Sequence, residues 1–137
     1  MKRAIFLVLM SIMILAACGT SSGSTDSDSE TPLATVPAEY AGKTNPYGTE
    51  MAAEGAKTFQ SSCEMCHGPE GRGDGPAGQS LDPRPKNLAV LQKGAGDDFL
   101  FWRISEGKPG TSMIAWKGIL SEEQIWQVVS FIRTLKE

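Results

Sequence analysis

The stretch Cys63-Glu64-Met65-Cys66-His67 places two cysteines with two residues between them and a histidine directly after the second cysteine. His67 is the only histidine of the chain, so any chemistry that needs an imidazole must use it. A Cys-x-x-Cys-His sequence is typical of covalent c-type haem attachment, in which both sulfurs form thioethers with the porphyrin vinyl groups. The histidine then lies beneath the iron as its proximal ligand. The sequence therefore predicts that Cys63, Cys66 and His67 bind one haem c.

Two other kinds of site also use paired cysteines. A tetrahedral zinc site needs a fourth ligand, and the one remaining cysteine, Cys18, lies far upstream. A thioredoxin-like redox site needs a βαβ setting, which the hydrophobic pattern does not indicate. Zinc binding and thiol redox chemistry are thus the alternatives to haem attachment.

The beginning of the chain has the features of a secretory signal. A short basic start precedes an apolar run over residues 4–17, which is too short to span a bilayer comfortably. Leu15-Ala16-Ala17-Cys18 looks like a bacterial lipobox. We therefore expect residues 1–17 to be removed and Cys18 to be lipidated, so that the protein is exported and anchored to a membrane with its haem domain on the periplasmic or extracellular side. An ordinary cleaved signal with an incidental cysteine is the alternative.

The mature chain of about 120 residues is one domain's worth, preceded by a polar segment. Residues 18–44 are rich in Ser, Thr, Pro and acidic residues, which predicts a flexible, lipid-anchored linker. A glycosylated stalk is an alternative for the same composition. Residues 45–137 are the predicted folded domain.

The charge balance excludes one class of partner. The chain has 13 Lys and Arg against 16 Asp and Glu, a net charge of −3. No basic footprint is present, so we do not expect the protein to bind nucleic acid.

Residues 45–137 carry helix patterns and no strand pattern. The first helix is predicted from near Glu50 to Cys63, with Thr49 as its N-cap. Small residues, among them Gly55, surround Phe59 on the apolar face of this helix, a pattern typical of a close helix–helix crossing.

Two further helices are predicted downstream. Acidic residues start one helix over residues 97–106, and Gly107 ends it. Ser121 and Gln124 form a capping box at the start of the last helix, whose broad apolar stripe leaves Trp126 to one side. The pattern predicts an all-α domain whose small core a large apolar cofactor would complete.

Five segments in order carry a family resemblance. They are CEMCHG at 63–68, GPEGRGDGPAG at 68–78, LDPRPKNL at 81–88, GTSMIAW at 110–116 and SEEQIWQVVSFIRTL at 121–135. In these segments residues 46–137 resemble a class I c-type cytochrome, similar to the lipoprotein cytochromes of respiratory complexes such as alternative complex III. The resemblance implies the cytochrome c fold: short helices and loops around one covalent haem, with crossing N- and C-terminal helices. Gly55 and Phe59 would then meet Val128 and Phe131.

The resemblance also implies a partner for the proximal histidine. The loop after the haem motif would place a proline carbonyl, that of Pro83 or Pro85, to accept a hydrogen bond from the His67 side chain. Such a bond orients a ligating histidine and raises its basicity.

Met113 is the expected sixth ligand of the iron. A second histidine does not exist, and three of the six methionines belong to the predicted signal. Met65 lies inside the attachment motif, on the wrong side of the ring, and Met51 is poorly oriented on the first helix. Met113 remains, and its place in the Gly107–Trp116 loop matches the family; a core-filling role is the alternative. The family commonly has proline after this methionine, where this chain has Ile114.

Two protein ligands would leave no open position on the iron, which predicts an electron-transfer protein rather than an enzyme. We expect a single-electron carrier of a respiratory or photosynthetic chain outside the cytoplasm. Its redox partners would be a quinol-oxidising complex, a terminal oxidase or a reaction centre. One alternative is a fixed haem subunit of a larger membrane oxidoreductase complex. Another is a haem enzyme or gas sensor with an open sixth position.

Overall fold

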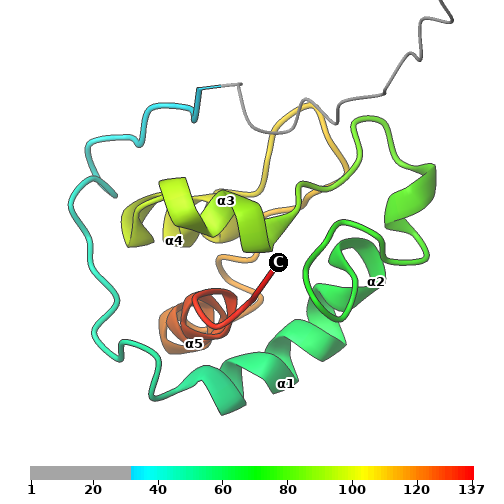
Figure 1. Ribbon diagram of the computed structural model, residues 1–137. Helices are drawn as coiled ribbons and strands as arrows, with labels where there is room; N and C mark the ends of the chain where they lie inside the picture. Colours follow the sequence, from blue (N-terminus) through cyan, green and yellow to red (C-terminus); the bar gives the residue numbers. More distant parts are fainter. Residues whose placement is uncertain (1–31) are drawn as a thin grey trace, which may run out of the picture.

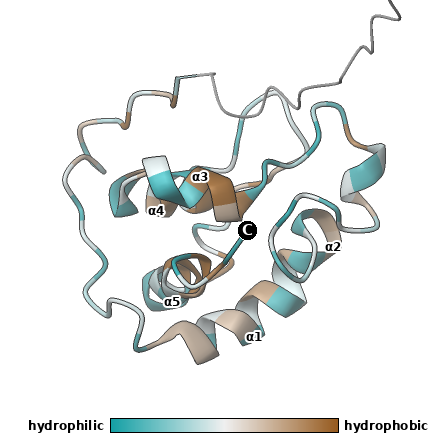
Figure 2. Ribbon diagram, in the orientation of Figure 1, coloured by the Kyte–Doolittle hydropathy of each residue, from teal (hydrophilic) through white to brown (hydrophobic). Residues whose placement is uncertain are grey.

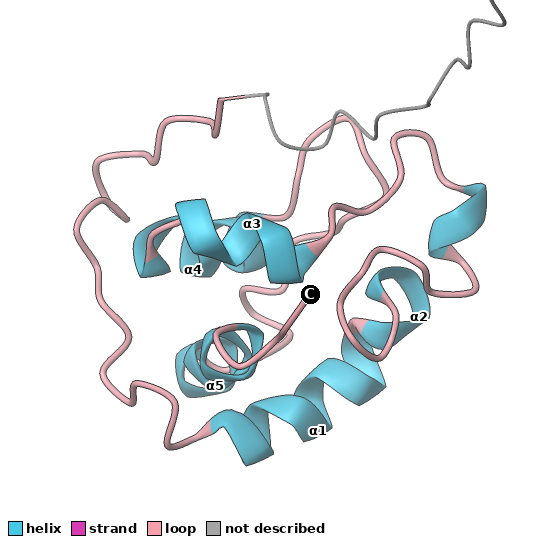
Figure 3. Ribbon diagram, in the orientation of Figure 1, coloured by secondary structure: helices cyan, strands magenta, loops and turns pink. Residues whose placement is uncertain are grey.

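The structure is a computed structural model that describes residues 32–137, so the predicted signal segment, Cys18 and the first part of the predicted linker lie outside the described residues. Five α-helices and one short 3-10 helix follow one another (Figure 1): α1 (Ala52–Ser62), α2 (Glu64–His67), η1 (Gly78–Ser80), α3 (Leu88–Gly94), α4 (Asp97–Glu106) and α5 (Glu122–Ile132). Figure 3 shows no strand in this part of the chain, and the predicted all-α class is confirmed. None of its helices has the length and apolar character to cross a membrane.

The crossing of α1 and α5 is the closest approach between helices. A Cβ atom on Gly55 would lie only 1.8 Å from the main-chain oxygen of Gln127, so glycine is required where the two backbones meet. One helical turn along α1, Phe59 is 2% exposed, and its ring centroid lies 4.9 Å from that of Phe131. The predicted meeting of the first and last helices is thus confirmed.

Helix α5 begins as its sequence predicts. The Ser121 hydroxyl accepts a hydrogen bond from the Gln124 N–H (3.1 Å), and the Gln124 side chain accepts one from the Ser121 N–H (2.9 Å). The apolar stripe of the helix is buried, and α5 shows both hydrophilic and hydrophobic segments in Figure 2, as expected for an amphipathic helix. Trp126, expected to lie to one side, is 5% exposed because Phe101 of α4 stacks on it at 4.0 Å between ring centroids.

Two helix starts differ from the predictions. The N-cap of α1 is Met51 without a side-chain cap, and Thr49 contributes only its carbonyl oxygen, which accepts from the Ala52 N–H (3.1 Å). A turn over residues 46–51 delays the helix. Helix α3 was not predicted, although Asn87 caps it by accepting from the N–H groups of Ala89 (3.0 Å) and Val90 (3.3 Å).

An N-terminal strap, residues 36–45, packs on the helices although residues 18–44 were predicted as a flexible linker. Tyr40 is 6% exposed, its ring centroid lies 6.1 Å from that of Phe101, and its hydroxyl donates a hydrogen bond to the Glu106 carboxylate. A composition poor in large apolar residues concealed this single aromatic anchor.

Hydrogen bonds to the first turn of α4 hold the rest of the strap. The Gly42 N–H donates to Oδ2 of Asp98 (2.9 Å), and the Asn45 N–H donates to Oδ2 of Asp97 (3.0 Å). The ordered domain therefore begins before residue 45 and includes the strap.

Candidate functional site

The Cys-x-x-Cys-His motif lies at the end of α1 and forms the single turn of α2. The Cys63 N–H donates to the Phe59 carbonyl (2.7 Å), and the Cys63 carbonyl accepts from the N–H groups of Cys66 (3.1 Å) and His67 (2.9 Å). Cys63 thus ends one helix and starts the next. Residues three and four apart on a helix face the same side, so Cys66 and His67 lie on the side of Cys63. The predicted cofactor residues Cys63, Cys66 and His67 are brought together on one turn.

Both cysteines of the motif are free, half-buried thiols. Burial, and to a smaller degree the neighbouring Cys66, raises the pKa of Cys63 to about 12. Zinc-binding and redox-active cysteines are thiolates whose pKa values are lowered instead. Within residues 32–137, no group of three or more His, Cys, Asp or Glu side chains is placed to hold a metal ion. The donor set therefore suits two thioether bonds to a haem better than a zinc or dithiol site.

A glycine-rich loop after His67 covers the carbonyl groups of this turn. The Gly73 N–H donates to the His67 carbonyl (2.8 Å), and the Ala77 N–H donates to the Met65 carbonyl (3.0 Å). A Cβ atom at Gly75 would lie 2.5 Å from the Met65 oxygen, so the loop can approach this closely only without side chains. The sequence showed the glycines, and the fold shows that they hold the haem motif in place.

His67 is half-buried, and one nitrogen of its imidazole has no hydrogen-bond partner. Its Nδ1 atom is buried without a hydrogen bond in the described structure. Burial lowers the pKa of His67, and the main chain of Lys86 opposes this shift in part. A lowered pKa keeps the ring neutral at pH 7, and neutral imidazole is the form that binds metals. A half-buried, neutral histidine whose buried Nδ1 atom has no hydrogen bond fits the predicted proximal ligand.

The predicted proline acceptors lie in the segment that leads to Lys86. Pro83 is exposed and Pro85 is half-buried. A Cβ atom on Gly73 would meet the Pro85 carbonyl oxygen at 2.2 Å, so this oxygen faces the loop that covers the haem motif. Acceptance by Pro83 or Pro85 stays a prediction, and the main chain of Lys86, one residue further, is the group that acts on His67 here.

Met113 lies in the loop between α4 and α5 and is half-buried. Its side chain and that of Cys63 pack against the same hydrophobic core cluster. The Met113 carbonyl accepts from the Lys108 N–H (2.9 Å), and the Met113 N–H donates to the Thr111 hydroxyl (3.2 Å). Met65, by contrast, is 63% exposed, as expected for a residue that does not bind the iron.

Sequence reasoning missed the contacts that organise the loop before Met113. The guanidinium of Arg103 lies over the rings of Trp102 (4.1 Å to the centroid) and Phe99 (5.5 Å), and its Nη1 donates to the Gly107 carbonyl (3.1 Å). The spacing of Phe99, Trp102 and Arg103 three and four positions apart places them on one face of α4. The bond to Gly107 could not be read from it.

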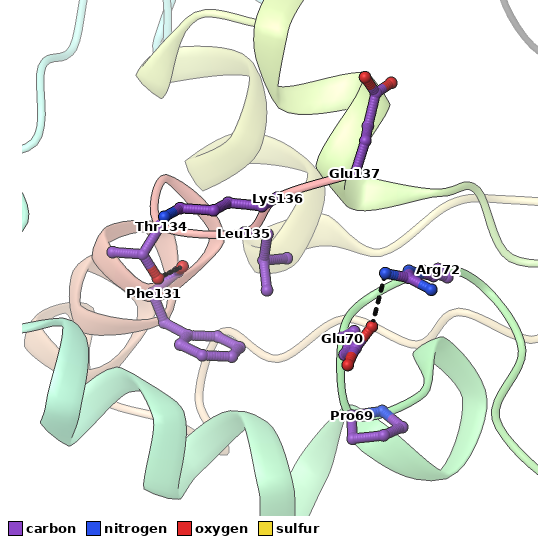
Figure 4. A pocket seen from close by; sticks show the side chains of 8 residues that line it. All are labelled: Pro69, Glu70, Arg72, Phe131, Thr134, Leu135, Lys136 and Glu137. Atoms are coloured by element: carbon purple, nitrogen blue, oxygen red, sulfur yellow. Dashed lines mark hydrogen bonds and ion pairs between the residues drawn. The ribbon is translucent and has the colours of Figure 1, made fainter.

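One surface pocket lies beside the haem motif without containing any predicted site residue. It measures about 400 Å³ and opens between the loop after His67 and the C-terminal residues (Figure 4). Phe131 lies at its base, and an ion pair between Arg72 and Glu70 (2.7 Å) stands on one side. The pocket is separate from the side chains of Cys63, Cys66, His67 and Met113.

Comparisons with known proteins agree with this geometry. The family described as cytochrome C oxidase, cbb3-type, subunit III matches residues 50–132, so the strap precedes the matched region. The fold is similar to a chain of the Kuenenia stuttgartiensis reducing HAO-like protein complex Kustc0457/Kustc0458, with a TM-score of 0.57 and 26% identity over 64% of this chain and 44% of that one.

Two further solved structures share the fold. Cytochrome CL from the marine methylotrophic bacterium Methylophaga aminisulfidivorans has a TM-score of 0.53 and 24% identity over 66% of this chain and 60% of that one. The KustC0563 c-type cytochrome has a TM-score of 0.50 and 26% identity over 61% of this chain and 98% of that one. The chain thus spans less than two thirds of the first two structures.

The family match covers α1 to α5 and includes the haem motif and the Met113 loop. The solved neighbours with printed functions are c-type cytochromes or parts of redox complexes. This chain belongs to the class I c-type cytochromes, in the family described as cytochrome C oxidase, cbb3-type, subunit III.

Proposed function

We propose that this protein is a membrane-tethered, single-electron carrier outside the cytoplasm that holds one haem c. The observation that carries the proposal is the single turn of α2, which presents Cys63 and Cys66 as free thiols beside the half-buried His67, whose Nδ1 atom is buried without a hydrogen bond. Two thioether bonds and one imidazole are the complete protein contribution to the proximal side of a c-type haem.

The ligand set determines what such a site can do. A c-type haem supplies one-electron exchange between ferric and ferrous iron when it is bound. His67 would bind one axial position and Met113 the other, and thioether sulfur favours the ferrous state and raises the reduction potential. Protein ligands at both axial positions leave no place for a substrate, which favours a carrier over an enzyme or gas sensor.

Replacement of the sixth ligand tests this assignment. The ferric wild-type protein should show the far-red sulfur-to-iron charge-transfer band and should bind carbon monoxide poorly when reduced. Met113→Ala should lose the band, bind carbon monoxide readily and have a lower potential, while the haem stays attached through Cys63 and Cys66. Met65→Ala, which changes an exposed methionine, is the matched control. Rapid, stoichiometric carbon monoxide binding by the wild-type protein would support the open-site alternative instead.

Membrane attachment through Cys18 is the second part of the proposal. The supporting observation is the lipobox-like sequence at residues 15–18. Because the strap packs on the domain from residue 36, the predicted tether shortens to residues 18–35, which reach roughly 20–25 Å root-mean-square. Cys18→Ser should release a soluble, red protein, and mass spectrometry of the wild type should find a lipidated Cys18. An unmodified N-terminus at Gly19 or Thr20 would refute the anchor.

A fixed subunit of a larger oxidoreductase is a second candidate function. The matched family is described as an oxidase subunit, and one structural neighbour is part of a complex. Copurification from detergent-solubilised membranes separates the two candidates. A stoichiometric complex with a quinol-oxidising complex, a terminal oxidase or a reaction centre favours the fixed subunit, whereas recovery of the chain alone favours the mobile carrier.

A further inference from the structure

The loop that carries Met113 begins with a tight turn. Lys108-Pro109-Gly110-Thr111 has proline and then a glycine at φ +77°, and the Thr111 N–H donates to the Lys108 carbonyl (3.1 Å). Proline followed by a left-handed glycine is the sequence signature of a type II β-turn. The turn reverses the chain so that Lys108 faces Met113, and the Lys108 N–H donates to the Met113 carbonyl (2.9 Å).

The Thr111 hydroxyl connects this turn to the methionine. Oγ1 donates to the Lys108 carbonyl (2.8 Å) and accepts from the Met113 N–H (3.2 Å). A threonine that accepts from the N–H two residues later forms a side-chain turn that restrains the main chain between them. Both main-chain polar groups of Met113 are therefore bonded to the same turn, and one of the two bonds depends on a single hydroxyl.

Other hydrogen bonds hold the loop at its two ends: Arg103 donates to the Gly107 carbonyl, and the Trp116 N–H donates to main-chain carbonyls of α4 (3.1 Å). Next to Met113 itself the chain has less support. Ile114 stands where the family commonly has proline, and its side chain is 56% exposed. An exposed isoleucine neither restricts φ as proline does nor anchors the chain by burial. On the other side, Gly107 packs against the main chain of residues 113–115 and holds the base of the loop, but a glycine contributes no side-chain hydrogen bond.

We propose that Thr111 is the positioning residue for Met113. Its hydroxyl holds the methionine main chain in the conformation in which the sulfur closes the sixth position of the iron, and so supplies the restraint that proline gives elsewhere. The inference rests on the proposed ligation by Met113. It adds the residue that determines how often the loop opens, and therefore how well the site excludes exogenous ligands.

The test compares Thr111→Val with the haem-loaded wild type. Valine keeps the shape of threonine but can neither donate to Lys108 nor accept from Met113. Since carbon monoxide binds only when the sulfur has left, its apparent association rate follows the open fraction of the loop. The rate for the ferrous protein should rise on the order of tenfold, the change expected when a side-chain bridge worth one or two ordinary hydrogen bonds is lost. The ferric charge-transfer band should weaken.

Two variants make the outcome specific. Thr111→Ser keeps the hydroxyl and should restore the wild-type rate and band. Thr134→Val removes a comparable bond, from Oγ1 to the Phe131 carbonyl (2.7 Å), at the exposed end of α5 and should leave both readouts unchanged. Thermal unfolding of all variants separates loop opening from a general loss of stability.

The three informative results are distinct. If the wild type shows the charge-transfer band and Thr111→Val behaves like Thr134→Val, the positioning role is wrong while Met113 ligation stands. If Thr111→Ser binds carbon monoxide as fast as Thr111→Val, the hydroxyl is not the cause and the inference also fails. If the wild type itself lacks the band and binds carbon monoxide rapidly, the proposed function fails first.

Discussion

Gly55→Ala is the substitution for which the structure makes the sharpest prediction. In an exposed helix, alanine in place of glycine stabilises by about 1 kcal/mol. Here the new Cβ atom would lie 1.8 Å from the Gln127 oxygen and 3.1 Å from the Cβ of Phe131. The oxygen belongs to the main chain of α5 and cannot rotate away, so one helix must move.

The size of the effect follows from that movement. To bring the 1.8 Å contact to the 3.0 Å limit of real Cβ contacts, α1 and α5 must separate by about 1.2 Å. A gap of that size forfeits a quarter to a half of the dispersion energy between facing atoms. The crossing buries Phe59, Val128 and Val129, all at most 2% exposed. Overpacking of this kind typically costs ~1–3 kcal/mol, and a clash with main chain lies at the upper end of that range, so we expect a net destabilisation of about 2 kcal/mol after the helix-propensity gain.

Chemical denaturation of the haem-loaded protein, followed by far-UV circular dichroism, measures this difference. Gly94→Ala is the matched control, because Gly94 ends α3 and a Cβ atom there would meet nothing within 4 Å. It should be neutral or slightly stabilising. The reasoning about the crossing is refuted if Gly55→Ala is as stable as the wild type or if the two variants change stability alike.

Two further outcomes are expected. Phe59→Ala should lower the free energy of unfolding by about 3–5 kcal/mol, the usual range for a buried phenylalanine, and a change in reduction potential without such a loss would contradict its packing role. Hydrogen bonds from Tyr40 and Lys117 lower the pKa of Glu106 below its usual value. The stabilisation of the strap by the ionised carboxylate is therefore fully present above that usual value and is lost as the pH falls through the lowered pKa. The protection factors of the strap amides, which correct for the slower intrinsic exchange at low pH, should therefore fall at acid pH, and a Glu106→Gln variant whose strap responds to acid as the wild type does would exclude this carboxylate as the cause.

Local signals predicted much of the architecture. The predicted helix over residues 97–106 coincides with α4, and the capping box of Ser121 and Gln124 forms as expected. Such features depend on residues within one or two helical turns, so the sequence contains all the partners that they need. The Asn87 cap of α3 is also local, but α3 has only seven residues, too few for helical periodicity to identify it.

The chemistry of the proximal side likewise followed from one short motif. Two cysteines and the only histidine occupy positions of a single turn, and a helix brings such positions together whatever surrounds it. The prediction that Met113 is the distal ligand was reached by elimination among six methionines and by its place in the family pattern. The structure adds the bonds that hold the main chain of Met113, which join residues two to five positions apart through a turn.

Only the tertiary structure decided which distant segments meet. Tyr40 binds Glu106, 66 residues further along the chain, and turns a segment of linker-like composition into part of the domain. Trp126 is buried because α4 brings Phe101 against it, although its position on α5 lies off the apolar stripe. The sequence determined each helix and the haem motif because their partners are neighbours in the chain. The strap and the pairing of helices arise from contacts between surfaces that exist only after those helices have formed.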